Sequence, residues 1–133
     1  MRLVVDTGVF SASLSRRRPM VYDRLVARLA GNQLFLASPT VAELRYGALV
    51  AQWAKPRRDR LEAAMAVTTV VPVTDSLLSA VAELRFACRR IGHPLASSAH
   101  SSDLWIAGSA VSIRATLITG DQVFSDTPGL SLA

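Results

Sequence analysis

The fold is decided by residues 100–126, HSSDLWIAGSAVSIRATLITGDQVFSD. The first half of this stretch predicts a helix that opens on Asp103. The apolar run 115–119 then predicts a short strand, and Asp121 follows directly after it. In an open α/β sheet, ligands bind outside the carboxyl ends of the strands. Asp103 and Asp121 are therefore candidates for a functional site.

The same alternation of short apolar runs and helical segments continues through the rest of the chain. Strands are predicted at 2–5, 34–37, 68–73 and 115–119, with a further short one at 130–132. Pro72 places the third of these at a sheet edge or a strand end. The pattern predicts a single α/β domain over residues 1–133, with a mainly parallel central sheet of four or five short strands flanked by helices.

Local signals predict where the helices begin and end. Thr40 and Glu43 have the spacing of a capping box, and Asp75 is expected to cap the long helix that stops before Gly92. Residues 55–58 are interpreted as a link between two helices, and residues 92–102 as a polar, irregular loop. Further helices are expected at 9–16, from Pro19 to the stop at Gly31, from Ser38 onward, and up to Ala66.

Composition limits the class of protein. The chain has 133 residues, half of them hydrophobic, and no apolar run approaches the roughly 18 residues of a membrane span. The lone Cys88 offers no disulfide, which favours a reducing, cytoplasmic location. The net charge of +5 is carried almost entirely by arginine, whose guanidinium group binds phosphate bidentately and so suits nucleic acid. An arginine-rich genome explains the same composition equally well.

Four of the ten acidic residues fall at a strand exit or a helix start: Asp6, Glu43, Asp103 and Asp121. Each alone is explained by a turn or a cap. Turns and caps do not explain why all four occur together, because the strand ends of a parallel sheet face one edge and would bring the four carboxylates close to one another. Carboxylates about 4 Å apart repel by roughly 4 kcal/mol per pair at an effective dielectric of about 20. Either the acids take up protons or a divalent cation lies among them. Hard oxygen ligands without histidine or cysteine at metal-ligand spacing select Mg²⁺ or Mn²⁺. Beside an arginine-bearing surface, such an ion suggests phosphodiester hydrolysis in which the metal activates water.

Four segments carry a family resemblance: VVDT at 4–7, SPTVAELRYGA at 38–48, DLWIA at 103–107 and LITGDQVF at 117–124. They resemble the PIN-domain ribonucleases and, within that family, the VapC-type toxins of toxin–antitoxin pairs. The resemblance implies a Mg²⁺- or Mn²⁺-dependent endoribonuclease that cleaves RNA and is inhibited by a cognate VapB-type antitoxin. It also implies catalytic and metal-binding roles for the four acids above, and supporting roles for Thr7 and Thr119. We expect the protein to form a homodimer through apolar helix faces.

The sequence departs from the family pattern at one position, and the resemblance assigns no role to several other residues. Gly8 stands where the family often has Ser or Asn, so one hydrogen bond to the site is expected to be missing. Asp126 is interpreted as a loop cap, and the loop histidines His93 and His100 as bystanders. Possible RNA contacts come from two basic clusters, for which a solvated surface is an equally good interpretation: Arg16, Arg17 and Arg18, and Arg57 and Arg58.

Single features of the sequence also fit three other functions. The triplet Asp6-Thr7-Gly8 resembles the active site of aspartic proteases, but that fold is all-β, and the helical spacing of residues 77–91 argues against it. A phosphoaspartate receiver needs a late lysine, and none follows Lys55. A catalytically silent PIN-like module that binds RNA or a protein is the main alternative; RNA binding without cleavage in Mn²⁺ would favour it.

Overall fold

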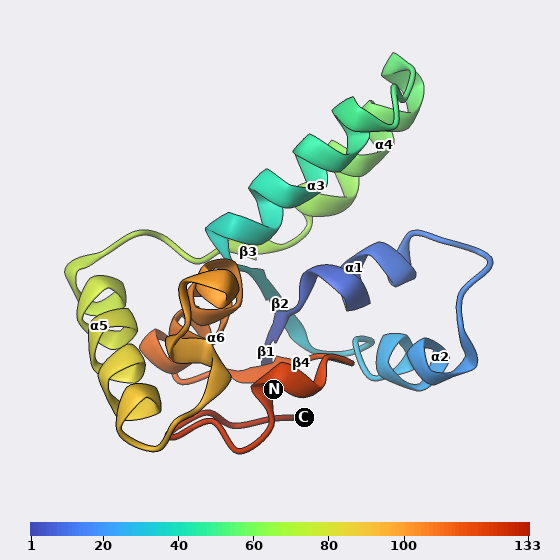
Figure 1. Cartoon of the computed structure of the whole chain (residues 1–133). Helices are drawn as coiled ribbons and strands as arrows, with labels where there is room; N and C mark the ends of the chain where they lie inside the picture. Colours follow the sequence, from blue (N-terminus) through green and yellow to red (C-terminus); the bar gives the residue numbers. More distant parts are fainter.

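A computed structural model describes all 133 residues as an α/β fold around a four-stranded parallel sheet (Figure 1). The strands are β1 (Arg2–Val5), β2 (Gln33–Leu36), β3 (Thr69–Val70) and β4 (Thr116–Ile118), in the order β3-β2-β1-β4. β1 lies between β2 and β4, with Leu3 opposite both Leu34 and Thr116. The predicted fold class and parallel sheet are confirmed.

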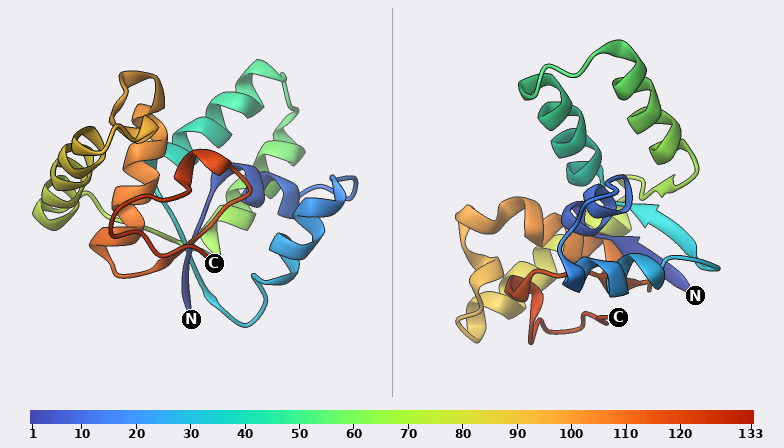
Figure 2. Two further views of the ribbon diagram at one scale, coloured as in Figure 1. Left: turned by 60° about the horizontal axis from the view of Figure 1, so that its bottom comes forward. Right: turned by 90° about the vertical axis from the view of Figure 1, so that its right-hand side faces the viewer.

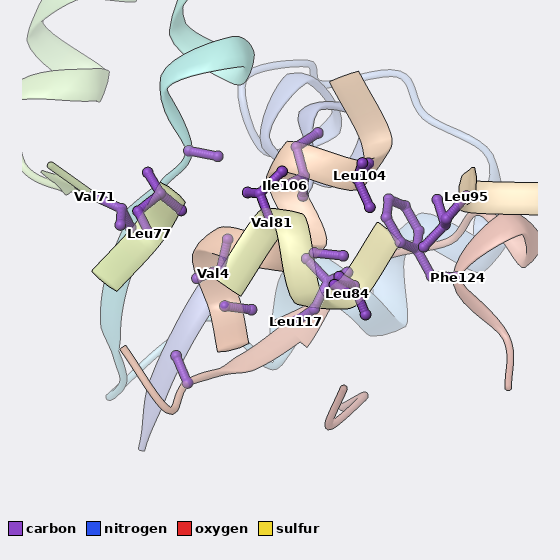
Figure 3. Close-up of a cluster of buried hydrophobic side chains, with 14 of the residues drawn as sticks. Val4, Val71, Leu77, Val81, Leu84, Leu95, Leu104, Ile106, Leu117 and Phe124 are labelled. Atoms are coloured by element: carbon purple, nitrogen blue, oxygen red, sulfur yellow. The ribbon is translucent and has the colours of Figure 1, made fainter. Parts of the chain in front are cut away.

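Alternate residues of β1 enter two separate hydrophobic cores, so the sheet is buried on both faces as parallel sheets are. Val4 belongs to the core that includes α5 (Asp75–Arg90) and α6 (Ser101–Ser112), drawn in Figure 3. Leu3 and Val5 belong to the other core, with residues of α1, α3 and α4. The bounds of these helices and of α2 are α1 (Thr7–Ser13), α2 (Met20–Ala27), α3 (Ser38–Val50) and α4 (Lys55–Ala66).

The α3–α4 hairpin extends away from the sheet, whereas α5 and α6 lie side by side on one of its faces (Figures 1 and 2). The contact between α5 and α6 is close at Gly108, where a β-carbon would lie 2.6 Å from Val81 Cγ2. Cys88 on α5 is fully buried in the same core, so its role is that of a small packed side chain. No helix is long and apolar enough to cross a membrane.

Two predicted helix caps and one predicted link are wrong, although α3 does begin at Ser38 as expected. The Thr40–Glu43 capping box does not form, because α3 already begins at Ser38 and the buried Thr40 hydroxyl accepts a hydrogen bond from Thr7 instead. The cap of α5 is Thr74, whose hydroxyl accepts from the Leu77 amide at 3.2 Å, one residue before the predicted cap at Asp75. Residues 55–58 are the first turn of α4, since a proline is well tolerated there, and the link lies at 51–54.

Other segments differ in extent from the prediction. The segment 92–102 holds two short 3₁₀ helices, η1 (Pro94–Ala96) and η2 (Ser98–His100), before α6 begins at Ser101. β3 has only two residues, Thr69–Val70, where a strand at 68–73 was expected. It lies at the sheet edge and ends before Pro72, which has no N–H to donate to a neighbouring strand. The expected strand at 130–132 is a single bridge between Leu117 and Leu132, and a 3₁₀ helix that was not predicted, η3 (Gln122–Phe124), follows β4. The first two helices also end earlier than expected, at Ser13 and Ala27.

Candidate active site

Asp6 lies at the carboxyl end of the central strand β1, where it is also the N-cap of α1. One carboxylate oxygen, Oδ1, accepts a hydrogen bond of 2.8 Å from the Thr7 amide. Asp6 is 8% exposed, one of four buried polar residues of the chain. A charged side chain is rarely so buried without a partner, so the surroundings of Asp6 decide what it can do.

Thr119 supplies the second partner of Asp6 from the neighbouring strand end. Because Val5 is paired with Ile118, the residues that follow β1 and β4 lie next to each other. The Thr119 hydroxyl donates to Asp6 Oδ2 at 2.6 Å and accepts from the Asp121 amide at 3.0 Å. One hydroxyl group therefore ties the two strand-end acids together.

Asp121 and Asp103 complete this group of carboxylates. Asp121 is exposed and accepts from the Val123 amide at 2.9 Å, which caps η3. Asp103 lies in the first turn of α6 and is half-buried. Its Oδ2 lies 3.2 Å from His100 Nδ1. The carboxyl edge of the sheet thus carries Asp6 after β1 and Asp121 after β4, and the charge of Asp103 in the first turn of α6 acts on Asp6.

The electrostatic surroundings of Asp6 include both of the other acids. Burial raises the pKa of Asp6 above its ordinary value of 3.8, while the hydrogen bonds from Thr119 and Thr7 lower it. The negative charges of Asp103 and Asp121 raise it further. The site is therefore one in which negative charge is held at a free-energy cost and in which a cation would be stabilised.

Glu43 is not brought into this group. It is exposed on α3, and its charge is not among the influences on Asp6. In this conformation no three acidic, histidine or cysteine side chains lie close enough together to hold one metal ion. Of the four expected acids, Asp103 and Asp121 thus act on Asp6 through their charge, whereas Glu43 is not among the groups that do so.

Two threonines connect the site to α3. The Thr7 hydroxyl donates to the Thr40 hydroxyl at 3.0 Å, and Thr40 is fully buried. The start of α1, which carries Asp6 as its cap, is thereby joined to the start of α3, which carries Glu43. Thr40 was not predicted as a site residue, because its spacing to Glu43 indicated a cap instead.

Tyr22 explains the glycine at position 8. A β-carbon on Gly8 would lie 3.2 Å from the Tyr22 hydroxyl oxygen, and one on Gly120 would lie 3.2 Å from Tyr22 Cε1. The ring therefore packs against both segments that carry strand-end acids, Asp6 two residues before Gly8 and Asp121 directly after Gly120. Tyr22 fills the space that a side chain at position 8 would take.

The arginines proposed to contact RNA differ in whether their side chains are exposed or already paired within the protein. Arg16 and Arg17 are exposed, whereas Arg18 pairs with Asp23 at 2.7 Å and donates to the carbonyls of residues 12 and 15. Arg57 lies 3.8 Å over the Trp53 ring. Arg58 is exposed and lines a surface cavity of α3 and α4. Arg18 is thus a structural residue, and Arg16, Arg17 and Arg58 remain available.

Both loop histidines have specific partners, in contrast to the expected role of bystanders. His93 Nε2 lies 2.8 Å from the Ser125 carbonyl oxygen and joins η1 to the segment after η3. His100 contacts Asp103 as described. The available signal was the three-residue spacing of His100 and Asp103 at a helix start, where such side chains are neighbours. Asp126 is exposed with a positive φ of 57°, consistent with a turn residue.

Comparison with known proteins assigns the family. The PIN domain model matches residues 3–130, so the chain belongs to the PIN domain family. The fold is similar to that of a chain of VapBC2 from Rickettsia felis bound to a promoter DNA fragment, with a TM-score of 0.80 at 22% identity over 100% of this chain and 98% of that one. Chains of two further complexes are also similar, VapBC-1 of nontypeable Haemophilus influenzae (TM-score 0.78, 23% identity, covering 100% and 97%) and VapBC-5 of Mycobacterium tuberculosis (0.69, 27%, 98% and 93%).

The VapBC-5 structure is described as a member of the VapBC family of toxin–antitoxin systems. The resemblance to VapC-type PIN proteins that the sequence motifs indicated is therefore confirmed. No curated protein matches the sequence.

Proposed function

We propose that this chain is a metal-dependent endoribonuclease, the toxin of a toxin–antitoxin pair. The observation that carries the proposal is the group formed by Asp6, Asp103 and Asp121 at the carboxyl edge of the sheet, with Asp6 buried and held by Thr119. Membership of the PIN domain family and the likeness to VapBC complexes support the same function.

The donor chemistry of the group fits Mg²⁺ or Mn²⁺. All three side chains offer carboxylate oxygens, the ligands that these hard cations prefer. Burial first, and then the negative charges of Asp103 and Asp121, raise the pKa of Asp6, and a divalent cation nearby would stabilise its ionised form. Asp6, Asp103 and Asp121 would hold the ion once their side chains move closer together than they are in this conformation, and Glu43 would be added from α3. When bound, the ion would polarise the scissile phosphate and lower the pKa of the attacking water.

The chain's own residues have separate tasks in this proposal. Thr119 and Thr7 fix the two oxygens of Asp6 and so set the direction in which the carboxylate faces. Exposed Arg16, Arg17 and Arg58 would attract the RNA backbone, because guanidinium groups bind phosphate at long range and bidentately at contact.

The similarity to chains of VapBC structures also suggests binding partners. We propose that a VapB-type antitoxin binds the protein and that two copies associate through apolar helix faces. Exposed apolar side chains support both associations: Tyr46 and Leu49 on α3 are 69% and 63% exposed, and Phe86 on α5 is 63% exposed. We also propose a cytoplasmic location, which the single, unpaired Cys88 supports. The solution mass of the isolated chain tests the dimer, since a monomeric mass contradicts it.

The test of the enzymatic function is cleavage of a mixed cellular RNA pool by purified protein, in Mn²⁺ and in EDTA. Asp103→Asn controls for contaminating nuclease. Asp126→Asn is a matched control, because that aspartate is exposed and its charge is not among the influences on Asp6. We expect discrete fragments with metal from the wild type and from Asp126→Asn, and none from Asp103→Asn. Intact RNA in every lane, with folded protein free of antitoxin, contradicts the proposal.

The position of Glu43 favours one alternative, a silent module that binds RNA or protein without cleaving. An exposed Glu43 outside the group leaves three acids where the family resemblance implies four. Retention of RNA by the wild type in Mn²⁺, without cleavage of any RNA, would support this alternative.

A further inference from the structure

His100 contacts Asp103 of the acidic group, and the proposed function does not use it. It is the N-cap residue of α6, three residues before Asp103. We propose that His100 is a positioning residue that orients Asp103 by donating a hydrogen bond from Nδ1 to Oδ2. This inference rests on the proposed function, because it assigns His100 a task within the same site.

The geometry supports a directed contact. The Nδ1–Oδ2 distance is 3.2 Å, and the side chains of His100 and Asp103 are 38% and 28% exposed. N-cap side chains usually accept hydrogen bonds from the first amides of their helix. The His100 side chain makes no such cap and faces the Asp103 carboxylate instead.

The contact defines a tautomer. An ionised carboxylate can only accept, so Nδ1 of His100 must carry the proton. In His93 the same atom accepts a hydrogen bond of 3.1 Å from the Leu95 amide, which places the proton on Nε2, facing the Ser125 carbonyl oxygen. The two histidines of this chain are therefore expected to be opposite tautomers when neutral.

The backbone around His100 is fixed rather than loose. The His100 amide donates to the Ser97 carbonyl at 3.0 Å, and the Ser97 hydroxyl accepts from the Ala99 amide at 3.2 Å. These bonds close η2 immediately before α6 and set the direction of the ring. The ring is thus presented to Asp103 by a short turn that is itself hydrogen-bonded.

Asp103 needs such a partner because its neighbours repel it. The charges of Asp6 and Asp103 act unfavourably on each other. A donor on Oδ2 holds one oxygen of Asp103 in place and leaves Oδ1 free to face the rest of the group. Removing an outer partner of a metal-ligand side chain typically lowers metal affinity or activity by about 10- to 100-fold, and because this pair is partly exposed, we expect the lower end, about tenfold.

The first test is the tautomer itself, read from long-range ¹H–¹⁵N correlations of the metal-free protein at alkaline pH. We expect the Nδ1–H form for one histidine and the Nε2–H form for the other, with the Nδ1–H signals missing from His100→Ala. Nε2–H forms for both rings would overturn the proposal. This measurement needs no metal and no RNA, so it stands apart from the proposed function.

The second test compares three substitutions of His100 by Mn²⁺ titration and by steady-state cleavage. Asn places an amide N–H near the position of Nδ1, whereas Gln places it near Nε2 and Ala removes it. We expect Ala and Gln to lower Mn²⁺ affinity and kcat by about tenfold, with KM for RNA little changed, and Asn to restore much of both. Thermal unfolding of each variant, expected to stay near the wild-type value, separates positioning from loss of the fold.

These measurements distinguish failure of the proposed function from failure of the role of His100. If the wild type neither binds Mn²⁺ nor cleaves RNA, the proposed function fails. If the wild type does both and His100→Ala equals it, or if Asn is as impaired as Ala, the role of His100 fails while the function stands.

Discussion

The hydroxyl of Thr119 donates a 2.6 Å hydrogen bond to the carboxylate of Asp6, a residue 113 positions earlier in the chain. The same oxygen accepts from the Asp121 amide. The pairing of β1 with β4 makes this possible, since it places the two strand ends side by side. Asp6 is thus held as a buried carboxylate whose charge is stabilised by two donors and opposed by two neighbouring acids.

Thr119→Val should impair both the site and the fold. Valine has nearly the same shape but donates no hydrogen bond, so a buried oxygen of Asp6 loses its partner, which typically costs about 1–3 kcal/mol of stability. The pKa of Asp6 should rise further, and cleavage should fall about tenfold or more. Urea unfolding and cleavage rates measure the two effects. Thr119→Ser should stay close to wild type, and Thr116→Val, on the strand β4 that precedes Thr119, should leave cleavage unchanged.

Asp6→Asn should stabilise the protein at neutral pH while abolishing cleavage. Because burial raises the pKa of Asp6 in the folded state, the folded protein binds more protons than the unfolded chain between pH 3.8 and that raised pKa. The contribution of Asp6 to stability therefore falls as the pH increases through this window and stays lower above it. Unfolding free energies of wild type and Asp6→Asn across this range test the sign. A wild type that gains stability relative to the variant with rising pH would contradict it.

Gly108→Ala should loosen the contact between α5 and α6. Its β-carbon would lie 2.6 Å from Val81 Cγ2 and 3.4 Å from the Val81 α-carbon, so the helices must separate or Val81 must move. Overpacking of this kind typically costs about 1–3 kcal/mol. Gly47→Ala on α3, where a β-carbon meets nothing, should instead gain about 0.5–1 kcal/mol. Urea unfolding of both variants checks the contrast, and adding Val81→Ala should recover part of the loss at Gly108.

Arginines 16, 17 and 18 should not contribute alike to RNA binding. Arg16 and Arg17 are exposed, so replacing either by Ala should reduce the slope of log affinity against log salt by roughly 0.7 per lost phosphate contact. Arg18 pairs with Asp23 and bonds two carbonyls, so Arg18→Ala should mainly lower stability. Binding of single-stranded RNA to the inactive Asp103→Asn protein at several salt concentrations measures the slopes. Slopes for Arg16→Ala and Arg17→Ala equal to that of the Asp103→Asn parent would show that these side chains do not contact RNA.

Much of the fold could be predicted from the sequence because the parallel strands are buried on both faces and so form continuous apolar runs. Residues 2–5 and 115–119 illustrate this, and Asp6 and Asp121 could be placed at the strand ends for the same reason. Helix starts were less predictable, because several candidate caps compete locally. Thr40 had the spacing of a capping box, but its hydroxyl pairs with Thr7 from another helix, a tertiary contact that no local pattern contains.

The acidic site was predictable in part. Strand topology brings Asp6 and Asp121 together, and the start of α6 brings Asp103 near them. The position of Glu43 depends on the direction of its side chain in the first turns of α3, which spacing alone does not define, and the structure leaves it exposed. The contributions of His100 and Tyr22 depend on ring placement across turns, so they became visible only in three dimensions.

The central claim is that Asp6, Asp103 and Asp121 form one cation site, and calorimetric titration of Mn²⁺ into metal-free protein tests it most directly. We predict that the wild type and the control Asp126→Asn bind Mn²⁺ alike and that binding is strongly weakened in Asp6→Asn, Asp103→Asn and Asp121→Asn. A wild type that binds no Mn²⁺, or three variants that bind it as the wild type does, would contradict the claim.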